Sequence, residues 1–404
     1  MSGIVEHRLD GQEQAWSDGL AVVDRLREGG FKAYLVGGCV RDRLLGVPVH
    51  DVDVATSASP EQVGELFPRH VDVGRQFGVM VVILAAGRHI EVASLRSDGA
   101  YVDGRHPQSI ALMSVDERDD VQRRDFTINA LLYDPQTATI HDHVGGLADL
   151  EKRILRVVGT PHQRLEEDRL RILRGLRFTA RYGLHIEPST WQAMQSVAMV
   201  GISRERIIEE WTKAFNHNSR SYWWSLVISS GHLHDLSPVA VSNPDLEAQL
   251  TALDTDGVLD CQAALALCWH HVPSRPRRLH LKNEPISRQL RETIVFVADQ
   301  LDAGSPQEEH ACRALIEHEA FQVVLRAWQV CGMAPSELAQ WQHRWQQWQQ
   351  TAPVIAAQDL MACGYQPGPQ LGAALRAVAD AQCAGRVISR QDALDLALRD
   401  FPVL

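Results

Sequence analysis

The stretch of sequence that decides the fold runs Leu35-Val36-Gly37-Gly38-Cys39-Val40-Arg41-Asp42 and continues, after a short turn, as His50-Asp51-Val52-Asp53-Val54. The first part is typical of a short apolar strand that ends at a glycine pair, from which a helix begins. The second part predicts a strand that carries two carboxylates. Side chains two residues apart on a strand project to the same face. We therefore expect Asp51 and Asp53 to point together, with Val52 and Val54 on the opposite face.

Asp51 and Asp53 are candidate metal ligands, because two carboxylates held side by side are costly unless a cation lies between them. The pair Gly37-Gly38 allows close approach of the backbone to a phosphate, which free N–H groups at the start of a helix can bind. Beside a phosphate, the expected cation is Mg²⁺, which prefers oxygen ligands. A pair of solvated acids on an edge strand is the alternative, and the glycine pair favours the metal.

Length and composition indicate an ordinary globular protein of two to four domains, with 404 residues, 45% hydrophobic and 23% charged. The longest apolar run, Val79–Ala86, is too short to cross a membrane. Seven dispersed cysteines indicate reduced thiols and a cytoplasmic location. The net charge of -11 argues mildly against nucleic acid, yet residues 151–182 hold nine Lys or Arg and four Asp or Glu. A local basic surface therefore remains compatible with the composition.

Hydrophobic periodicity changes along the chain. Helical spacing covers Trp16–Glu28, and Val79–Leu84 with His89–Leu95 predicts a β-hairpin. Glu91, in the second of these strands, is a candidate third metal ligand, and pairing with an arginine is the alternative. Beyond Arg153 the strand signals nearly vanish and helical spacing dominates. We therefore predict an α+β protein with an N-terminal α/β region and a helical remainder.

Charge interrupts the hydrophobic pattern at Arg123-Arg124-Asp125-Phe126-Thr127-Ile128-Asn129-Ala130. Consecutive arginines suit a triphosphate, although a solvated pair is the alternative interpretation. Together with the aspartates and the glycine pair, they fit nucleotidyl transfer. In such a reaction Mg²⁺ binds the triphosphate, activates the attacking hydroxyl and stabilises the leaving pyrophosphate.

Asp168 and Arg171 suggest how a base could be chosen without a template. Spacing predicts one helix over Glu167–Tyr182, with these two side chains neighbours on one face. A carboxylate accepts from an exocyclic amino group and a guanidinium donates to a ring nitrogen, a combination that cytosine and adenine match. Uracil and guanine would leave both side chains unpaired, at about 1–3 kcal/mol per buried group. The pair thus predicts CTP and ATP as substrates; a helix-surface ion pair is the alternative.

These motifs resemble a known family. The glycine and aspartate motifs resemble the nucleotidyltransferase head of the DNA polymerase beta superfamily. The arginine motif and Glu167-Asp168-x-x-Arg171 resemble the class II tRNA nucleotidyltransferases (CCA-adding enzymes) and the bacterial poly(A) polymerases. The resemblance covers about residues 30–215 in family order. It implies a polymerase-beta-like α/β head followed by an all-helical neck, body and tail in a seahorse shape.

The resemblance also implies roles for individual residues. The metals would be held by Asp51 and Asp53, with Glu91 added from the argument above. The nucleotide would be bound by Gly37, Gly38, Arg41, Arg124, Asp125, Asn129, Asp168, Arg171, Arg174 and Arg177. A hinge would be formed by Asp142, Gly145 and Gly146. The implied partner is tRNA, held through its 3′ end and acceptor arm, with no membrane association.

Four segments are expected: a catalytic head (residues 1–148), a nucleotide-selecting neck (149–215), and an RNA-binding body (216–350) and tail (351–404). The hinge motif departs from the family pattern, because His143-Val144 stand where a proline and an aromatic residue are usual. Arg75–Gly78 and the loop Tyr101–Pro107 resemble the CCA-adding members.

Alternatives remain from the sequence. CC-only addition and poly(A) addition use the same machinery. Transfer to a small molecule is disfavoured by the long helical half and by the Asp168/Arg171 motif, and a non-catalytic RNA-binding module is disfavoured by the paired aspartates.

Overall fold

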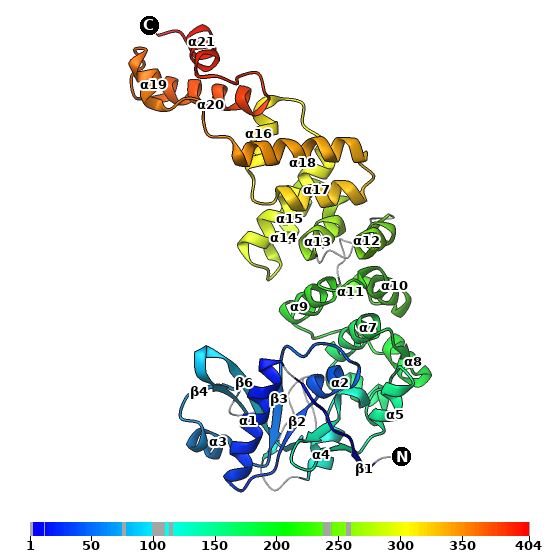
Figure 1. The fold of residues 1–404 in the computed structure, drawn as a ribbon. Coiled ribbons are helices and arrows are strands. Elements are labelled where there is room, and N and C mark those ends of the chain that lie inside the picture. The colour runs from blue at the N-terminus through cyan, green and yellow to red at the C-terminus, as the bar shows by residue number, and fades with distance from the viewer. Residues whose placement is uncertain are drawn as a thin grey trace. The chain divides into compact units, whose positions relative to one another are not determined.

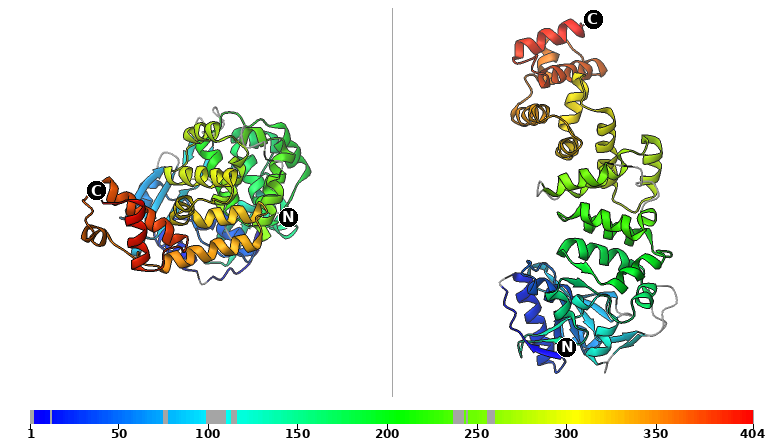
Figure 2. Two further views of the ribbon diagram at one scale, coloured as in Figure 1. Left: turned by 90° about the horizontal axis from the view of Figure 1, so that it is seen from above. Right: turned by 90° about the vertical axis from the view of Figure 1, so that its right-hand side faces the viewer.

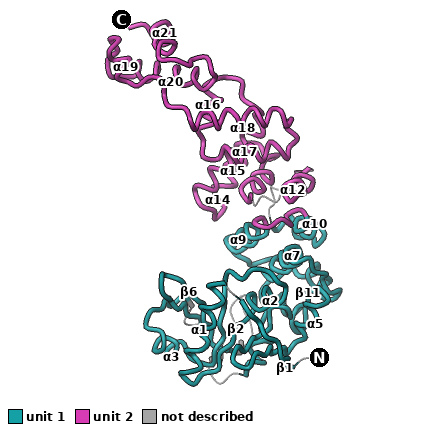
Figure 3. The backbone as a smooth tube through the Cα atoms, viewed as in Figure 1, with its two compact units in different colours: residues 1–214, 222–236 teal, residues 215–221, 237–404 magenta. Residues whose placement is uncertain are grey.

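The computed structural model describes residues 3–11, 13–74, 78–98, 110–112, 116–236, 243, 245–255 and 260–403. The chain forms two compact units, residues 1–214 with 222–236 and residues 215–221 with 237–404 (Figure 3). A sheet lies in the first unit, and the second is built from helices, so the predicted α+β class is confirmed. The division into head, neck, body and tail at residues 148, 215 and 350 stays a prediction. The loop Tyr101–Pro107 and residues 75–77 lie outside the described residues.

The strands of the described chain are β1 (Gly3–Glu6), β2 (Ala33–Val36), β3 (Asp53–Thr56), β4 (His70–Gly74), β5 (Val79–Ile83), β6 (His89–Ser94), β7 (Arg96–Asp98), β8 (Ile110–Leu112), β9 (Leu132–Asp134), β10 (Thr139–Asp142), β11 (Ile154–Leu155) and β12 (His185–Ile186). Eight of them form one sheet in the order β1-β10-β9-β2-β3-β6-β5-β4 (Figure 1). β5 and β6 pair antiparallel, which confirms the predicted hairpin. β3 and β6 pair parallel, and this pairing places two sequence-distant strands side by side.

Short helices connect the strands, and helices make up the described chain after β12 (Figure 2). Up to β12 they are α1 (Gln14–Glu28), α2 (Gly38–Leu44), α3 (Pro60–Leu66), η2 (Ala85–Gly87), α4 (Glu117–Gln122), η3 (Thr127–Asn129), α5 (Gly146–Glu151), α6 (Pro161–Glu167) and α7 (Leu170–Tyr182). Beyond β12 they are α8 (Pro188–Ser196), α9 (Arg204–Phe215), α10 (Arg220–Ser230), α11 (Leu233–Leu236), α12 (Leu246–Thr255), α13 (Cys261–His270), α14 (Ser274–Asn283), α15 (Arg288–Ala303), α16 (Glu309–Glu317), α17 (Phe321–Val330), α18 (Pro335–Gln350), α19 (Ala357–Ala362), α20 (Pro369–Cys383) and α21 (Arg390–Asp400). Within the described ranges, every helix is too short or too polar to span a lipid bilayer.

Alternate side chains of the central strands enter two different cores of the first unit. Leu35 and Val54 pack on the face that α1 covers, whereas Val36 and Ala55 pack on the other face. Because side chains alternate along a strand, Asp53 lies on the face of Ala55. The predicted alternation around Asp53 is therefore confirmed.

The strand that carries the aspartates begins later than its hydrophobic pattern indicates. The ladder between β2 and β3 ends at the pair Val36 and Asp53. Beyond it the chain turns away at Gly37, whose φ of +71° is a conformation that favours glycine. Asp51 consequently lies before β3, and the prediction that both aspartates are on one strand is wrong for Asp51.

Among the described residues of the second unit, two groups of helices each form a hydrophobic core. Val297, Phe321 and Trp341 belong to a core formed by α13 and α15–α18. Leu360 and Val378 belong to a second core, formed by α19–α21 and the segments that join them. The last helices can thus bury their apolar faces against one another.

Candidate active site

Four carboxylates line one cavity of about 310 Å³ beside the start of β3, and they include the three candidate metal ligands Asp51, Asp53 and Glu91; the fourth is Asp18. Asp53 and Glu91 are direct partners in the parallel ladder between β3 and β6, and neighbouring strands lie only about 4.8 Å apart. All three residues are exposed, so a small ion can reach them. The first unit therefore brings together the two predicted aspartates and the candidate third ligand.

The electrostatics of this cavity favour a bound cation. Although Asp53 is exposed, the protein around its carboxylate reduces the solvation of that group. This desolvation, and then the charges of Glu91 and Asp51, raise the pKa of Asp53 to about 6, against the opposing charge of Arg124. Arg88, which lines the same cavity, does not neutralise the cluster, because its Nε donates to Asp18 Oδ2 at 2.6 Å. Oxygen ligands that repel one another and remain accessible fit a divalent ion such as Mg²⁺.

The glycine pair faces two arginine side chains. A Cβ atom added at Gly37 would lie 3.4 Å from Nη1 of Arg124, and one added at Gly38 would lie 3.5 Å from Nη2 of Arg41. The N–H of Gly37 donates to the carbonyl of Leu131 at 3.2 Å. Gly37 therefore contributes its backbone conformation, and the guanidinium groups supply the positive charge for a phosphate at this place.

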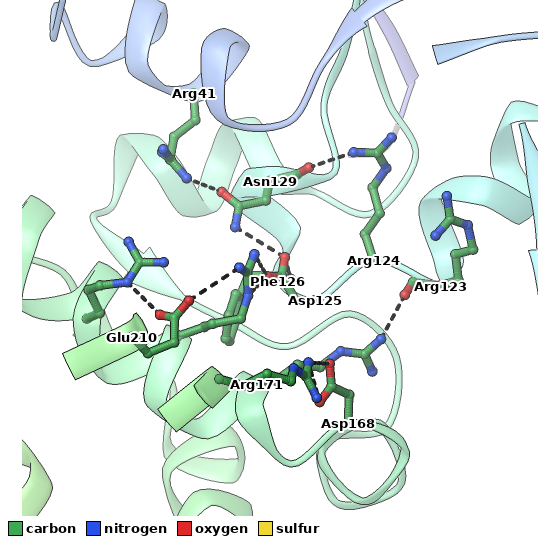
Figure 4. Close-up of polar contacts among 12 residues, drawn as sticks. Arg41, Arg123, Arg124, Asp125, Phe126, Asn129, Asp168, Arg171 and Glu210 are labelled. Carbon is green, nitrogen blue, oxygen red and sulfur yellow. Dashed lines mark hydrogen bonds and ion pairs between the residues drawn. The ribbon is translucent and has the colours of Figure 1, made fainter. Parts of the chain in front are cut away.

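Polar contacts link several of the predicted nucleotide-binding residues (Figure 4). Asp125 accepts hydrogen bonds from Nη2 of Arg174 at 2.8 Å and from Nδ2 of Asn129 at 3.1 Å. Asn129 accepts in turn from Arg41. Burial alone would raise the pKa of Asp125, but the charge of Arg174 and these hydrogen bonds lower it to about 2. Asp125 is therefore a charged scaffold for the surrounding donors.

Asp120 orients the two consecutive arginines. Its oxygens accept from Arg123 Nη2 at 2.6 Å and from Arg124 Nη2 at 3.0 Å. Asp120 is only 1% exposed. Burial opposes its ionisation, yet the two guanidinium groups lower the pKa of Asp120 below its ordinary value. The paired arginines are thus held by one anion, unlike the solvated pair considered as the alternative.

Asp168 lies between two helices, so the predicted single helix over Glu167–Tyr182 is wrong at its start. Its backbone is extended (φ -145°, ψ 97°), and α7 begins only at Leu170. Its carboxylate accepts from the N–H of Leu170 at 3.2 Å and from Arg206 Nη2 at 2.8 Å. Asp favours such turns because its side chain bonds nearby backbone N–H groups.

Arg171 is fixed by backbone carbonyls. Its Nη1 donates to the carbonyl of Arg164 at 2.6 Å, and its Nη2 to the carbonyl of Arg123 at 3.1 Å. The second bond joins the candidate base-selecting residue to the arginine motif. Arg171 does not pair with Asp168, which is engaged by Arg206. Its ion-pair partner is Glu167, whose Oε2 lies 3.4 Å from Nη1, and Arg171 is only 8% exposed.

Arg174 and Arg177 share a second anion, Glu210 of α9. Arg177 Nε donates to Glu210 Oε2 at 2.7 Å, and Arg174 Nη1 lies 3.8 Å from Oε1. Glu210 is 2% exposed. Arg174 bridges Asp125 and Glu210, whereas Arg177 is buried against Glu210.

The candidate hinge is a compact turn around Asp142. Its buried carboxylate accepts from the N–H groups of Gly145 and Gly146 at 2.8 and 2.9 Å, and from that of Leu147 at 3.0 Å. A Cβ at Gly146 would come within 2.2 Å of the carbonyl oxygen of Thr127, so any larger residue would displace η3. The turn thus fixes the approach of α5 to the arginine motif.

Several residues of the site escaped the sequence analysis, namely Asp120, Arg206 and Glu210. Asp120 could have been found, because it precedes Arg123 and Arg124 by three and four residues, a helical spacing. Arg206 and Glu210 lie 38 and 33 residues beyond their partners. Local spacing contains no signal for such contacts.

Comparisons with known proteins identify a matching family model and relatives of this chain. Residues 33–156 match the family model described as the poly A polymerase head domain. The CCA-adding enzyme of Streptococcus pneumoniae serotype 19F (strain G54) is 33% identical, covering 97% of this chain and 99% of its own. The CCA-adding enzyme of Streptococcus gordonii is 39% identical over 70% of this chain and 69% of its own.

Solved structures show the same fold. The Bacillus stearothermophilus CCA-adding enzyme in complex with CTP is 27% identical with a TM-score of 0.78, covering 96% of this chain and 98% of that one. The Thermotoga maritima CCA-adding enzyme complexed with tRNA_CCA has a TM-score of 0.70 at 19% identity, covering 99% of this chain and 100% of that one. With a full-length relative at 33% identity, the chain belongs to the CCA-adding enzyme family of nucleotidyltransferases.

Proposed function

We propose that this chain adds the CCA sequence to the 3′ end of tRNA, using CTP and ATP without a nucleic-acid template and releasing pyrophosphate. The observation that carries the proposal is the bond from Arg171 to the carbonyl of Arg123. It joins the residue suited to choosing a base to the motif suited to binding a triphosphate. Full-length similarity to CCA-adding enzymes supports the same assignment.

We propose two-metal phosphoryl transfer, in which Asp51, Asp53 and Glu91 would hold the divalent ions, for which we propose Mg²⁺. Such an ion lowers the pKa of an attacking hydroxyl and neutralises charge on the triphosphate and the leaving pyrophosphate. Arg41 and Arg124, which face the glycine pair, would orient the phosphates. Asp125 contributes by holding Arg174 and Asn129 in place, so that little reorganisation is needed when a nucleotide binds.

Asp168 and Arg171 would select the base while keeping their present partners. A carboxylate has about four acceptor sites and a guanidinium five donors. Arg206 and Leu170 use part of the acceptor sites of Asp168. Two backbone carbonyls and Glu167 use part of the donors of Arg171. The remaining sites match the amino group and ring nitrogen of cytosine or adenine. Uracil and guanine would leave them unpaired, at about 1–3 kcal/mol per group.

A basic surface of the second unit would contact the RNA backbone. Arg275, Arg278 and Lys282 of α14 are exposed. Asp299 pairs with Arg278 and offsets part of this charge, but three cations on one helix still form a local basic surface on a protein whose net charge is -11. Cations in such a patch neutralise phosphates and make binding salt-dependent.

All seven cysteines are free thiols. This fits the reducing environment of the cytoplasm, which we propose as the location of the protein.

The deciding experiment uses tRNA that lacks its terminal CCA, with products resolved at single-nucleotide length. We expect two added residues with CTP alone and three with CTP and ATP together. No extension under any of these conditions would contradict the proposal.

A second candidate function is partial or repetitive addition, because the matching family model is described as a poly A polymerase head domain. The same experiment separates the cases. A product that stops after two residues with both nucleotides present indicates a CC-adding enzyme. A ladder of many A residues indicates a poly(A) polymerase.

A further inference from the structure

A second group of metal-ligating side chains lies apart from the aspartates, in the first unit. Glu117 begins α4, His141 belongs to β10, and His143 follows β10 directly. One potential ligand atom from each of them lies within 4.8 Å of the others. None of the roles proposed above uses these three residues.

One carboxylate oxygen is the meeting point of the cluster. Glu117 Oε1 lies 2.5 Å from His141 Nδ1 and 3.1 Å from His143 Nε2. The other oxygen, Oε2, accepts from the hydroxyl of Tyr34 at 2.5 Å. Burial would raise the pKa of Glu117, but hydrogen bonds from His141, Tyr34 and His143 lower it to about 2. A charged carboxylate thus faces two imidazoles while a third group fixes its orientation.

The ligand types indicate which ion would fit. Two imidazoles and one carboxylate suit Zn²⁺ and related transition metals, whereas Mg²⁺ prefers oxygen ligands throughout. Tetrahedral Zn²⁺ places its ligand atoms about 3.3–3.6 Å apart, from bonds of about 2.0–2.2 Å. The oxygen–nitrogen distances of the hydrogen-bonded cluster are shorter than this ligand spacing, and small rotations of the side chains would be enough to reach it. The Tyr34 hydroxyl would act as the outer partner that orients a ligating carboxylate.

The cluster lies in the wall of an open cavity, although Glu117 and His141 are themselves only 8% and 9% exposed. Glu117, His141 and His143 line an open cavity of about 750 Å³, together with Tyr34 and Lys32. An ion can therefore enter, and a water molecule can complete its coordination. Three protein ligands with one open position is an arrangement that Zn²⁺ adopts.

We propose that Glu117, His141 and His143 bind one divalent transition-metal ion of the Zn²⁺ type, separate from the ion at the aspartates. Such an ion would fasten α4 to the candidate hinge, because the two histidines flank Asp142. Asp120, which holds Arg123 and Arg124, lies on the same short helix. The site would therefore stabilise the arginine motif without taking part in the chemistry.

The test is a calorimetric titration of the metal-stripped full-length protein with Zn²⁺ in excess Mg²⁺, which measures the number of ions bound and their affinity. Excess Mg²⁺ occupies the oxygen-rich aspartate site. A parallel titration with Co²⁺ reports imidazole ligation through its visible absorption. We expect one ion per chain, and about a tenfold or greater loss of affinity in His143→Ala and in Tyr34→Phe.

The matched control is His162→Ala, which removes the exposed imidazole 3.4 Å from Glu166 and should leave the affinity unchanged. A wild-type protein that takes up no Zn²⁺ would show that the cluster is only hydrogen-bonded. Equal affinity in the wild type and in a folded His143→Ala variant would place the ion elsewhere, and either result overturns the proposal. Because tRNA extension is measured separately with Mg²⁺, failure here leaves the proposed function untouched.

Discussion

Two carboxylates of the first unit, Asp53 and Asp125, have opposite electrostatic surroundings. Asp53 is flanked by Glu91 and Asp51, and its pKa is raised to about 6. Asp125 is bonded by Arg174 and Asn129, and its pKa is lowered to about 2. Arg174 neutralises Asp125, whereas the charge of Arg124 only partly offsets the repulsion at Asp53. The difference predicts that Asp53 holds a metal ion for the chemistry and that Asp125 holds other side chains in place.

The largest expected effect is on catalysis. Asp53→Asn should lower nucleotide transfer by at least about 1,000-fold, because loss of a metal ligand removes several kcal/mol of transition-state stabilisation. The free energy of unfolding should not fall, since the change removes one of several repelling charges. Single-turnover incorporation of CTP and urea unfolding measure the two quantities. Asp24→Asn, on the exposed side of α1, is the control, and activity retained in Asp53→Asn would refute the metal assignment.

Asp125→Ala should show the reverse pattern, with stability as the main loss. The change removes the carboxylate that Arg174 contacts at 2.8 Å and leaves the more distant Glu210, at 3.8 Å. Breaking a buried ion pair costs about 3–5 kcal/mol, and the lower end applies because Arg174 is 34% exposed. Urea unfolding measures the loss against Asp24→Ala, for which a change below about 0.5 kcal/mol is expected. Equal stability of the two variants would mean that Asp125 is no scaffold.

Arg171→Ala tests whether Arg171, which is bonded to the arginine motif, also selects the base. Without the guanidinium, the preference for CTP over UTP should fall by about tenfold or more, since one unsatisfied group is worth about 1–3 kcal/mol. Competition between the two nucleotides on tRNA lacking CCA measures the ratio. Arg169→Ala, which removes a bond to the carbonyl of Val200, is the neighbouring control. A preference that survives in Arg171→Ala would assign the selection to other residues.

The smallest expected effect is a pH-dependent stabilisation by Mg²⁺. A raised folded-state pKa means that Asp53 favours folding below the unfolded-state value near 4, and that this contribution is lost as the pH rises through about 6. Added Mg²⁺ should therefore raise the Tm by a few degrees at pH 7.5 and much less at pH 5. Thermal unfolding of the wild type and Asp53→Asn measures the shift. An equal rise at both pH values, or in the variant, would place the ion elsewhere.

The accuracy of the sequence-based predictions depended on the range of the interaction involved. The helix at α1 and the hairpin of β5 and β6 follow from local apolar spacing, and both were confirmed. The predicted strand start at Asp51 and helix start at Asp168 were wrong. The spacing of apolar residues does not show where the pairing of two strands ends, as it does before Asp51. It also does not show that the distant Arg206 binds the carboxylate of Asp168. Sequence motifs thus located the candidate site better than they located the ends of its elements.

By itself the sequence determined the local parts of this protein: a strand that ends at Gly37, the carboxylates that follow, and the arginine motif. Local backbone geometry restricts which residue types can occupy turns, strands and helix starts. The order of residue types along the chain therefore predicts these local elements. Only the tertiary structure decided which charges meet. Glu91 reaches Asp53 through a parallel strand pair, and Arg174 reaches Asp125 from 49 residues away. Electrostatic energy depends on distance through space, and that distance is set when the chain folds.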